Sequence, residues 1–117
     1  KIWSADESSQ RVDQLLSRFG LSHVADSRPF SVSGSQRKLT CVLRAFVHEP
    51  EVVFLDDPAT GLKDENLNQF MQYIEELYLK RGLKQVIFTG DQVALVRKLQ
   101  PIEVLISQST FITKAAV

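Results

Sequence analysis

Two short stretches decide the fold of this chain: VSGSQ at residues 32–36 and FLDDP at residues 54–58. The first is a Ser-Gly turn that opens a helix, where backbone N–H groups are unobstructed and the helix dipole favours negative charge. The second is an apolar strand that ends in Asp56 and Asp57, and carboxylates at the carboxyl end of a buried strand are suitable magnesium ligands. Together they predict a phosphate contact, then a helix, then a strand that leads to a magnesium site.

Both stretches lie in one longer run, VSGSQRKLTCVLRAFVHEPEVVFLDDPATGL, at residues 32–62. This run resembles the segment of ABC-type ATPases that extends from the signature motif to the Walker B motif and the D-loop. Residues 32–36 match the signature, residues 52–56 match Walker B and residues 60–62 begin the D-loop, without a gap. The resemblance extends loosely from about Val12 to about Ile106. It implies an α/β, partial P-loop NTPase (ABC ATPase) fold, with parallel sheet strands, flanking helices and part of the α-helical subdomain.

The resemblance divides the chain at residue 50. Residues 1–50 correspond to part of the α-helical subdomain, with the signature motif and the helix that follows it. Residues 51–117 correspond to the C-terminal part of the α/β core, with Walker B, the D-loop and the H-loop region. No stretch reads GxxxxGK[ST], the loop that cradles nucleotide phosphates. We therefore expect the C-terminal half of one nucleotide-binding domain, without a Walker A motif.

The resemblance also assigns roles to the site residues. Four signature residues contact ATP, at the γ-phosphate bound by the opposite protomer: Ser33, Gly34, Ser35 and Gln36. Asp56 holds Mg²⁺ through water, and Asp57 polarises the attacking water as general base. Without the resemblance these residues have plainer interpretations, namely a helix N-cap and a strand-end carboxylate that caps a turn.

The chain departs from the family pattern at four positions. Ser35 replaces the second signature glycine, and its Cβ narrows the approach of phosphate to the backbone. Asp57 replaces glutamate, which sets the carboxylate back by about an ångström and costs on the order of 100-fold in rate. Gly90, in the run TGDQ at residues 89–92, replaces the switch histidine, and Lys63 stands where the D-loop aspartate is expected. We therefore expect hydrolysis to be weak.

Composition limits the remaining classes of function. Fourteen basic and fourteen acidic residues balance, which argues against nucleic acid as the main partner. The single cysteine, Cys41, fits a reducing cytosol, and His23 and His48 lack further ligands at metal spacing, so we expect both on the surface. With no signal peptide or membrane-spanning run, the expected location is cytoplasmic, at the inner face of a membrane through a permease partner.

Hydrophobic periodicity predicts the secondary structure. Residues 1–9 are expected to be loosely held, and Cys41, Val42, Ala45 and Phe46 to be buried on the second helix. The third helix is expected to have Asp64 as its cap and an apolar stripe of Leu67, Phe70, Met71, Ile74 and Leu77. The expected helices cover residues 11–19, 34–47 and the segments after Asp64 and Asp91, and the expected strands cover residues 51–55, 84–89, 103–106 and 110–113.

The sequence leaves three functions open. The first is half of an ATP-binding subunit of an ABC transporter, which needs ATP, Mg²⁺, a second nucleotide-binding domain with ATP at the interface, and a membrane permease. It is an ATP hydrolase only as part of a complete domain dimer, with weakened catalysis. The second is a catalytically degenerate partner module that completes a composite site. The third is a regulatory protein that kept the fold and lost ATP chemistry.

Overall fold

Two parallel strands and the helix that connects them form the centre of the structure. The computed structural model describes residues 2–90, 103–107 and 110–114. Strands β1 (Val52–Leu55) and β2 (Gln85–Phe88) pair in parallel, from Val52 opposite Gln85 to Leu55 opposite Phe88, and α3 (Asp64–Lys80) connects them. This is a βαβ unit, the arrangement that strands alternating with helices predict.

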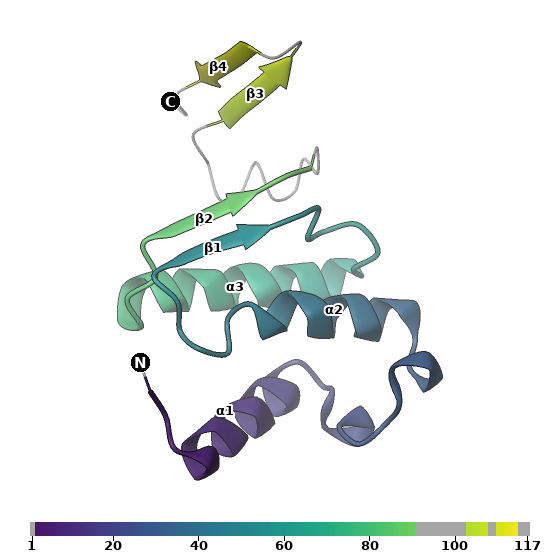
Figure 1. The fold of residues 1–117 in the computed structure, drawn as a ribbon. Coiled ribbons are helices and arrows are strands. Elements are labelled where there is room, and N and C mark those ends of the chain that lie inside the picture. Colours follow the sequence, from purple (N-terminus) through teal and green to yellow (C-terminus); the bar gives the residue numbers. More distant parts are fainter. Residues whose placement is uncertain (1, 91–102, 108–109, 115–117) are drawn as a thin grey trace.

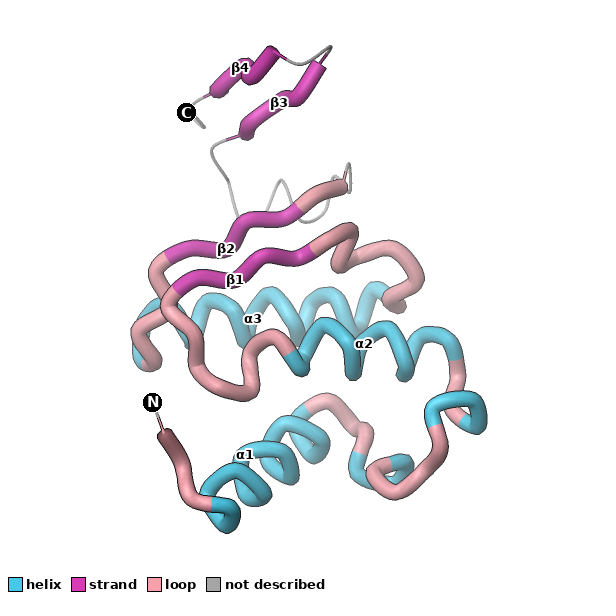
Figure 2. Tube along the Cα trace, in the orientation of Figure 1, coloured by secondary structure: helices cyan, strands magenta, loops and turns pink. Residues whose placement is uncertain are grey.

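The helices cover one face of the strand pair (Figure 2). Helices α2 (Gly34–Arg44) and α3 lie on this face, and β1 turns Val53 and Leu55 toward it, where both are buried. The alternate residues, Val52 and Phe54, are 44% and 74% exposed on the other face. The strand therefore alternates in burial with the period of two that a one-sided sheet requires.

The apolar stripe of α3 is as expected, but its cap is not. Every residue of the stripe is buried: Leu67, Phe70, Met71, Ile74 and Leu77. The cap position is Lys63, which makes no side-chain hydrogen bond, and Asp64 is the first helical residue. The prediction of Asp64 as the cap was wrong by one position. Its carboxylate still lies in the first turn, where the negative charge interacts favourably with the helix dipole.

The first helix begins earlier than its apolar pattern indicates. Helix α1 runs from Ala5 to Arg18, so the prediction that residues 1–9 are loosely held was wrong for its first turns. A capping box starts it: the Ser4 hydroxyl accepts from the Glu7 N–H, and the Glu7 carboxylate accepts from the Ser4 N–H at 2.8 Å. This Ser-x-x-Glu spacing satisfies two N–H groups that would otherwise lack partners.

Helix α2 buries a narrower face than was predicted. Its buried residues are Leu39, Val42 and Leu43, and Phe46 follows it at 0% exposure. Cys41 is exposed, so the prediction that it is buried was wrong, and Ala45, also expected to be buried, is only partly so. Positions 39, 42, 43 and 46 follow helical spacing on one face, and position 41 points away from that face.

One apolar core joins residues from both sides of position 50. The Phe46 ring meets the Phe70 ring edge-on at 5.5 Å and the Tyr73 ring at 6.1 Å. Helix α1 adds Leu15 to the same core, and β1 adds Val53. These contacts fix the helix that follows the signature against the strand pair.

The remaining elements are two 3₁₀ turns and a hairpin (Figure 1). The turns are η1 (Ser22–Val24) and η2 (Pro29–Ser31), and the hairpin consists of antiparallel strands β3 (Glu103–Ser107) and β4 (Thr110–Lys114). The two closing strands are thus confirmed. The helix expected after Asp91 lies outside the described residues. Among the helices that the structure describes, none is long and apolar enough to cross a bilayer.

Candidate functional site

The carboxyl ends of β1 and β2 bring acidic and hydroxyl side chains together. The parallel pairing continues one residue beyond the strands, because the Thr89 N–H donates to the Leu55 carbonyl at 3.0 Å. This bond places Thr89 beside the two carboxylates that follow β1. The strands therefore converge on one edge, as the carboxyl ends of parallel strands do.

The Thr89 hydroxyl bridges both aspartates. It accepts from the Asp57 N–H at 2.9 Å and donates its own proton to Asp56 Oδ1 in a short hydrogen bond. A hydroxyl has one proton to give, so these two bonds fix its orientation. The side chain of Asp56 and the backbone of Asp57 are thereby held by a single atom of the neighbouring strand.

Asp57 is held in an unusual conformation. Its φ is +44°, a left-handed value that is uncommon for residues other than glycine and costs conformational energy. Its Oδ1 accepts from the Thr60 hydroxyl at 2.8 Å. Within the described residues no donor reaches Oδ2, so this oxygen remains available to accept a proton or a water.

Gly90 lies directly against Asp57. A Cβ added at Gly90 would be 3.3 Å from Asp57 Oδ1, and the glycine has φ of +124°. Both features require glycine in this conformation, because L residues rarely adopt such a φ. The position at which the family resemblance leads one to expect a histidine is thus adjacent to Asp57.

The oxygen groups at this edge suit a hard divalent cation. Two carboxylates, Asp56 and Asp57, and two hydroxyls, Thr60 and Thr89, are gathered there, and oxygen ligands of this kind are those that Mg²⁺ prefers. In the part of the chain that the structure describes, no group of three or more His, Cys, Asp or Glu side chains is arranged to hold a metal. The edge fits Mg²⁺ as a partial site, to be completed by phosphate oxygens and water.

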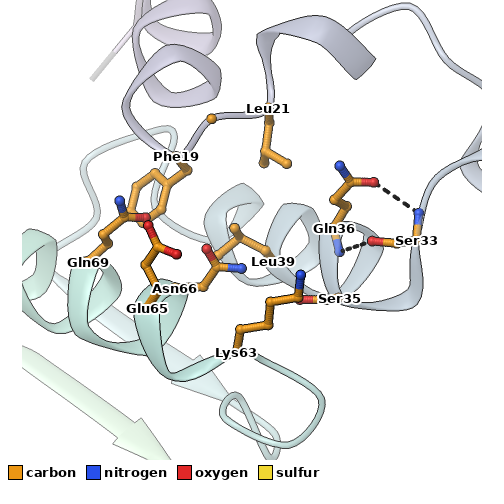
Figure 3. Close-up of a pocket in the computed structure, with 11 residues that line it drawn as sticks. Phe19, Leu21, Ser33, Ser35, Gln36, Leu39, Lys63, Glu65, Asn66 and Gln69 are labelled. Carbon is orange, nitrogen blue, oxygen red and sulfur yellow. Dashed lines mark hydrogen bonds between the residues drawn. The ribbon is translucent and has the colours of Figure 1, made fainter.

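The signature residues form the amino-terminal cap of α2. The Ser33 hydroxyl accepts from the Gln36 N–H at 3.2 Å, and the Gln36 side chain accepts from the Ser33 N–H at 3.0 Å (Figure 3). The hydroxyl proton of Ser33 is not used in this capping box, so it can still be donated to a ligand. The capping role and the ligand role of Ser33 are therefore compatible.

The start of α2 is open to an incoming anion. A Cβ added at Gly34 would meet no atom within 4 Å, and the first N–H groups of a helix have no partner within it. The Ser35 hydroxyl oxygen is buried, so that side chain points into the protein and not outward over the helix start. The N-terminus of α2 lies at the same end of the fold as the carboxyl ends of the strands (Figure 1).

A hollow of about 240 Å³ lies beside the signature residues 33–36 (Figure 3). Ser33, Ser35 and Gln36 line one side of it, and Lys63 and Asn66 from the start of α3 line another. Asp56 and Asp57 do not line this hollow. It is therefore separate from the carboxylate edge.

The sequence identified the aspartates but missed the residues that hold them. Thr60 and Thr89 received no functional role, although Thr60 is three residues after Asp57 and Thr89 directly follows the neighbouring strand. The signal for Thr89 is its place at the end of a parallel partner strand. His23 and His48 are exposed as expected, and the ring of His23 lies 3.4 Å from the Gln36 amide nitrogen.

Comparison with curated proteins finds ATP-binding proteins of transporters. The chain is 37% identical over 102 residues to the lipoprotein-releasing system ATP-binding protein LolD of Idiomarina loihiensis. It is 37% identical over 92 residues to the phosphonates import ATP-binding protein PhnC 1 of Rhodopseudomonas palustris. These alignments cover 87% and 79% of this chain but only 44% and 32% of the relatives. The chain thus spans less than half the length of either protein.

Solved structures and a family profile agree with these relatives. An ABC transporter in an inward-facing conformation matches 99% of this chain and 46% of its own, with a TM-score of 0.73 and 27% identity. The ATP-binding subunit of an ABC transporter matches in fold, with a TM-score of 0.69 at 24% identity over 81% of this chain and 39% of its own. The expected α/β fold of ABC ATPases is confirmed. The family profile described as ABC transporter matches residues 2–60, just over half of the chain, and the chain therefore belongs to the ABC transporter family.

Proposed function

We propose that this chain provides the C-terminal half of a nucleotide-binding domain in an ABC transporter. Residues 1–50 would be its share of the α-helical subdomain, and residues 51–117 its share of the α/β core. The observation that carries the proposal is the cluster of Asp56, Asp57 and Thr89 at the carboxyl edge of parallel strands. The open start of α2 at the same end of the fold supports it.

The two regions have separate tasks in this proposal. The signature residues bind the γ-phosphate of an ATP held by a second nucleotide-binding domain, through the first N–H groups of α2 and the hydroxyl proton of Ser33. Asp56 holds Mg²⁺ through water, and this ion, when bound, neutralises charge on the phosphates. Asp57 orients the attacking water and accepts its proton through Oδ2. Thr89 keeps both aspartates in place through its hydroxyl and takes no part in the proton transfer.

The partners of the proposed domain follow from its family. A second nucleotide-binding domain would complete the site, because the signature acts on a nucleotide bound elsewhere. A permease subunit would attach the pair to the inner face of a membrane, with the chain in the cytoplasm. The names of the relatives support transport as the process. A balanced charge of fourteen basic and fourteen acidic residues supports a partner other than nucleic acid.

A second candidate is a partner module with little catalysis of its own. Two observations favour it: Asp57 is one methylene shorter than the usual glutamate, and Gly90 offers no side chain beside the base. In this case the signature still contributes to the site of another chain, while the site at Asp57 hydrolyses slowly or not at all. The complex would then bind ATP with little or no turnover, and this difference distinguishes the two candidates.

The test uses the assembled transporter that contains this chain. ATP-dependent dimerisation and steady-state ATPase activity are measured for the parent, Gly34→Asp and Asp56→Asn, with the exposed Asp13→Asn as the control. We expect Gly34→Asp to abolish dimerisation and Asp56→Asn to abolish Mg²⁺-dependent turnover, while the control matches the parent. Normal dimerisation of Gly34→Asp would refute the signature assignment. The second candidate is correct if Gly34→Asp abolishes dimerisation but the parent complex itself shows no ATP turnover. In that case Asp56→Asn has no activity to remove.

A further inference from the structure

A second, smaller hollow lies between α1 and the C-terminal half of α3, away from the candidate ATP site. Its volume is about 100 Å³. Its polar lining consists of Arg11, Gln14, Arg18, Tyr73, Glu76 and Arg81. None of these residues has a role in the proposed ATP chemistry, and three of them are arginines.

Tyr73 brings an unpartnered hydroxyl to this hollow. The side chain is buried, with 4% exposed, and its ring is fixed edge-on against Phe19 at 5.7 Å and against Phe46 at 6.1 Å. Within the described residues its hydroxyl has no hydrogen-bond partner. Burial raises the pKa of Tyr73, so the group is a neutral O–H donor. A buried donor without a partner is unfavourable, and a ligand or an ordered water normally satisfies it.

Arg11 brings unused donors to the same hollow. Its Nη2 is 2.8 Å from Glu49 Oε1, an ion-pair distance that lacks hydrogen-bond geometry. Its Nε is also buried without a partner among the described residues. The N–H groups of Nε and Nη2 form one edge of the planar guanidinium, and such an edge binds two oxygens of a carboxylate or phosphate at once.

The local charge leaves room for one anion. Arg11 and Arg81 share Glu49, at 2.8 and 3.5 Å, and Arg18 pairs with Glu76 at 2.7 Å. Three guanidinium groups thus face two carboxylates, which leaves one positive charge in excess. Glu49 has only 8% of its side chain exposed, so solvent screens this cluster less than it would a surface pair.

We propose that this hollow binds one small free oxyanion of the phosphate class, held by the side edge of Arg11 and by the Tyr73 hydroxyl. Arg18 and Arg81 lie around it and contribute attraction. Its volume equals that of a few water molecules, which is enough for a phosphate. The bound anion would connect α1 to α3, and α1 is the element that leads through η1 and η2 to the signature. A phosphate at this point would therefore stabilise the position of the helix that precedes the ATP-contacting turn.

The experiment measures phosphate binding to the intact protein without nucleotide. Isothermal calorimetry and thermal melting are recorded in sodium phosphate and in sodium chloride of equal ionic strength, so that general screening cancels. The variants are Tyr73→Phe, which removes only the hydroxyl, and Arg11→Lys. The second variant keeps the positive charge but loses the guanidinium edge formed by the N–H groups of Nε and Nη2. Arg44→Lys makes the same chemical change at an exposed arginine outside the hollow and serves as the control. Gly34→Asp tests whether phosphate binds at the signature instead.

We expect phosphate to raise the melting temperature of the parent, Arg44→Lys and Gly34→Asp alike. Tyr73→Phe and Arg11→Lys should each weaken phosphate binding by about tenfold, the value of one or two hydrogen bonds to a charged group. Tyr73→Phe should also be at least as stable as the parent in chloride, because it removes an unsatisfied buried group. The proposal is wrong if phosphate has no effect beyond chloride, as a water-filled hollow predicts, or if Gly34→Asp alone removes the effect. It is equally wrong if Tyr73→Phe and Arg11→Lys bind phosphate as the parent does.

Discussion

The hydroxyl of Thr89 is the part of the site whose removal has the most specific consequence. Thr89→Val keeps the shape of the side chain but removes both the bond that it donates to Asp56 and the bond that it accepts from Asp57. A typical hydrogen bond contributes about 0.5–1.5 kcal/mol to stability, and one to a charged group contributes more. Asp56 and Thr89 are exposed, so water replaces part of the loss. We therefore expect a loss of about 1–2 kcal/mol in the free energy of unfolding.

Thr89→Ser is the matched control, since it keeps the hydroxyl and loses only an exposed methyl group. Its cost should stay within about 0.5 kcal/mol. Urea denaturation of the parent and both variants gives the comparison. A double-mutant cycle of Thr89→Val with Asp56→Ala then isolates the pairwise energy, which should be on the order of 1 kcal/mol.

The same substitution also affects the chemistry of the assembled transporter. Without the bridging hydroxyl the two aspartates are no longer positioned by β2, and a displacement of about 1 Å can lower turnover on the order of 100-fold. The affinity for ATP should change little, because Thr89 does not contact the nucleotide in the proposed site. The reasoning is refuted if Thr89→Val is as stable as Thr89→Ser and also turns ATP over at the same rate.

Three further substitutions and one pH titration test the rest of the structure. Gly34→Asp should leave the melting temperature near that of the parent, because the space around it is open, and should abolish ATP-dependent dimerisation. Gly90→Ala should cost about 1–3 kcal/mol of unfolding free energy through its φ of +124°, whereas Gly34→Ala, measured beside it, should cost far less. Asp57→Glu should raise the ATPase rate of the assembled complex by extending the base toward its water; an unchanged rate would mean that Asp57 is not the limiting group. A hydrogen bond from Arg18 lowers the pKa of Glu76 below its ordinary 4.5. The stability from this exposed pair is therefore present above that value and is lost as the pH falls through the lowered pKa. Denaturation from neutral to acidic pH should show this loss in the parent and not in Arg18→Gln.

The third helix was predictable because its signal is local and long. The five apolar residues of the predicted stripe recur along α3 at helical spacing, and all five are buried. The first helix shows the limit of that signal, since its opening turns carry no large apolar residue and were expected to be loose. The Ser4–Glu7 capping box was nevertheless present in the sequence as a Ser-x-x-Glu pattern. Capping chemistry, which does not depend on hydrophobic periodicity, was the information that the prediction did not use.

Exposure and strand-end contacts were harder to predict because they depend on what packs nearby. Cys41 is apolar enough for a core, but α2 presents only the face that contains Leu39 and Val42 to its neighbours. The bonds of Thr89 depend on the register of β1 and β2, which pairs residues more than thirty positions apart. A sequence pattern gives the order of the strands, but only their pairing determines which side chains meet at the edge.

Asp57 and Gly90 depart from the family pattern independently in the sequence, but in the structure they are neighbours. A Cβ at position 90 would lie 3.3 Å from Asp57 Oδ1, the same oxygen that accepts from Thr60. Any side chain at position 90 therefore has to displace the carboxylate as well as leave the present φ of +124°. Introducing a histidine there would change the position of the base before it contributed a new hydrogen bond. The two departures therefore cannot be treated as separate losses, and Asp57→Glu is the single change that tests the base without first disturbing the backbone at Gly90.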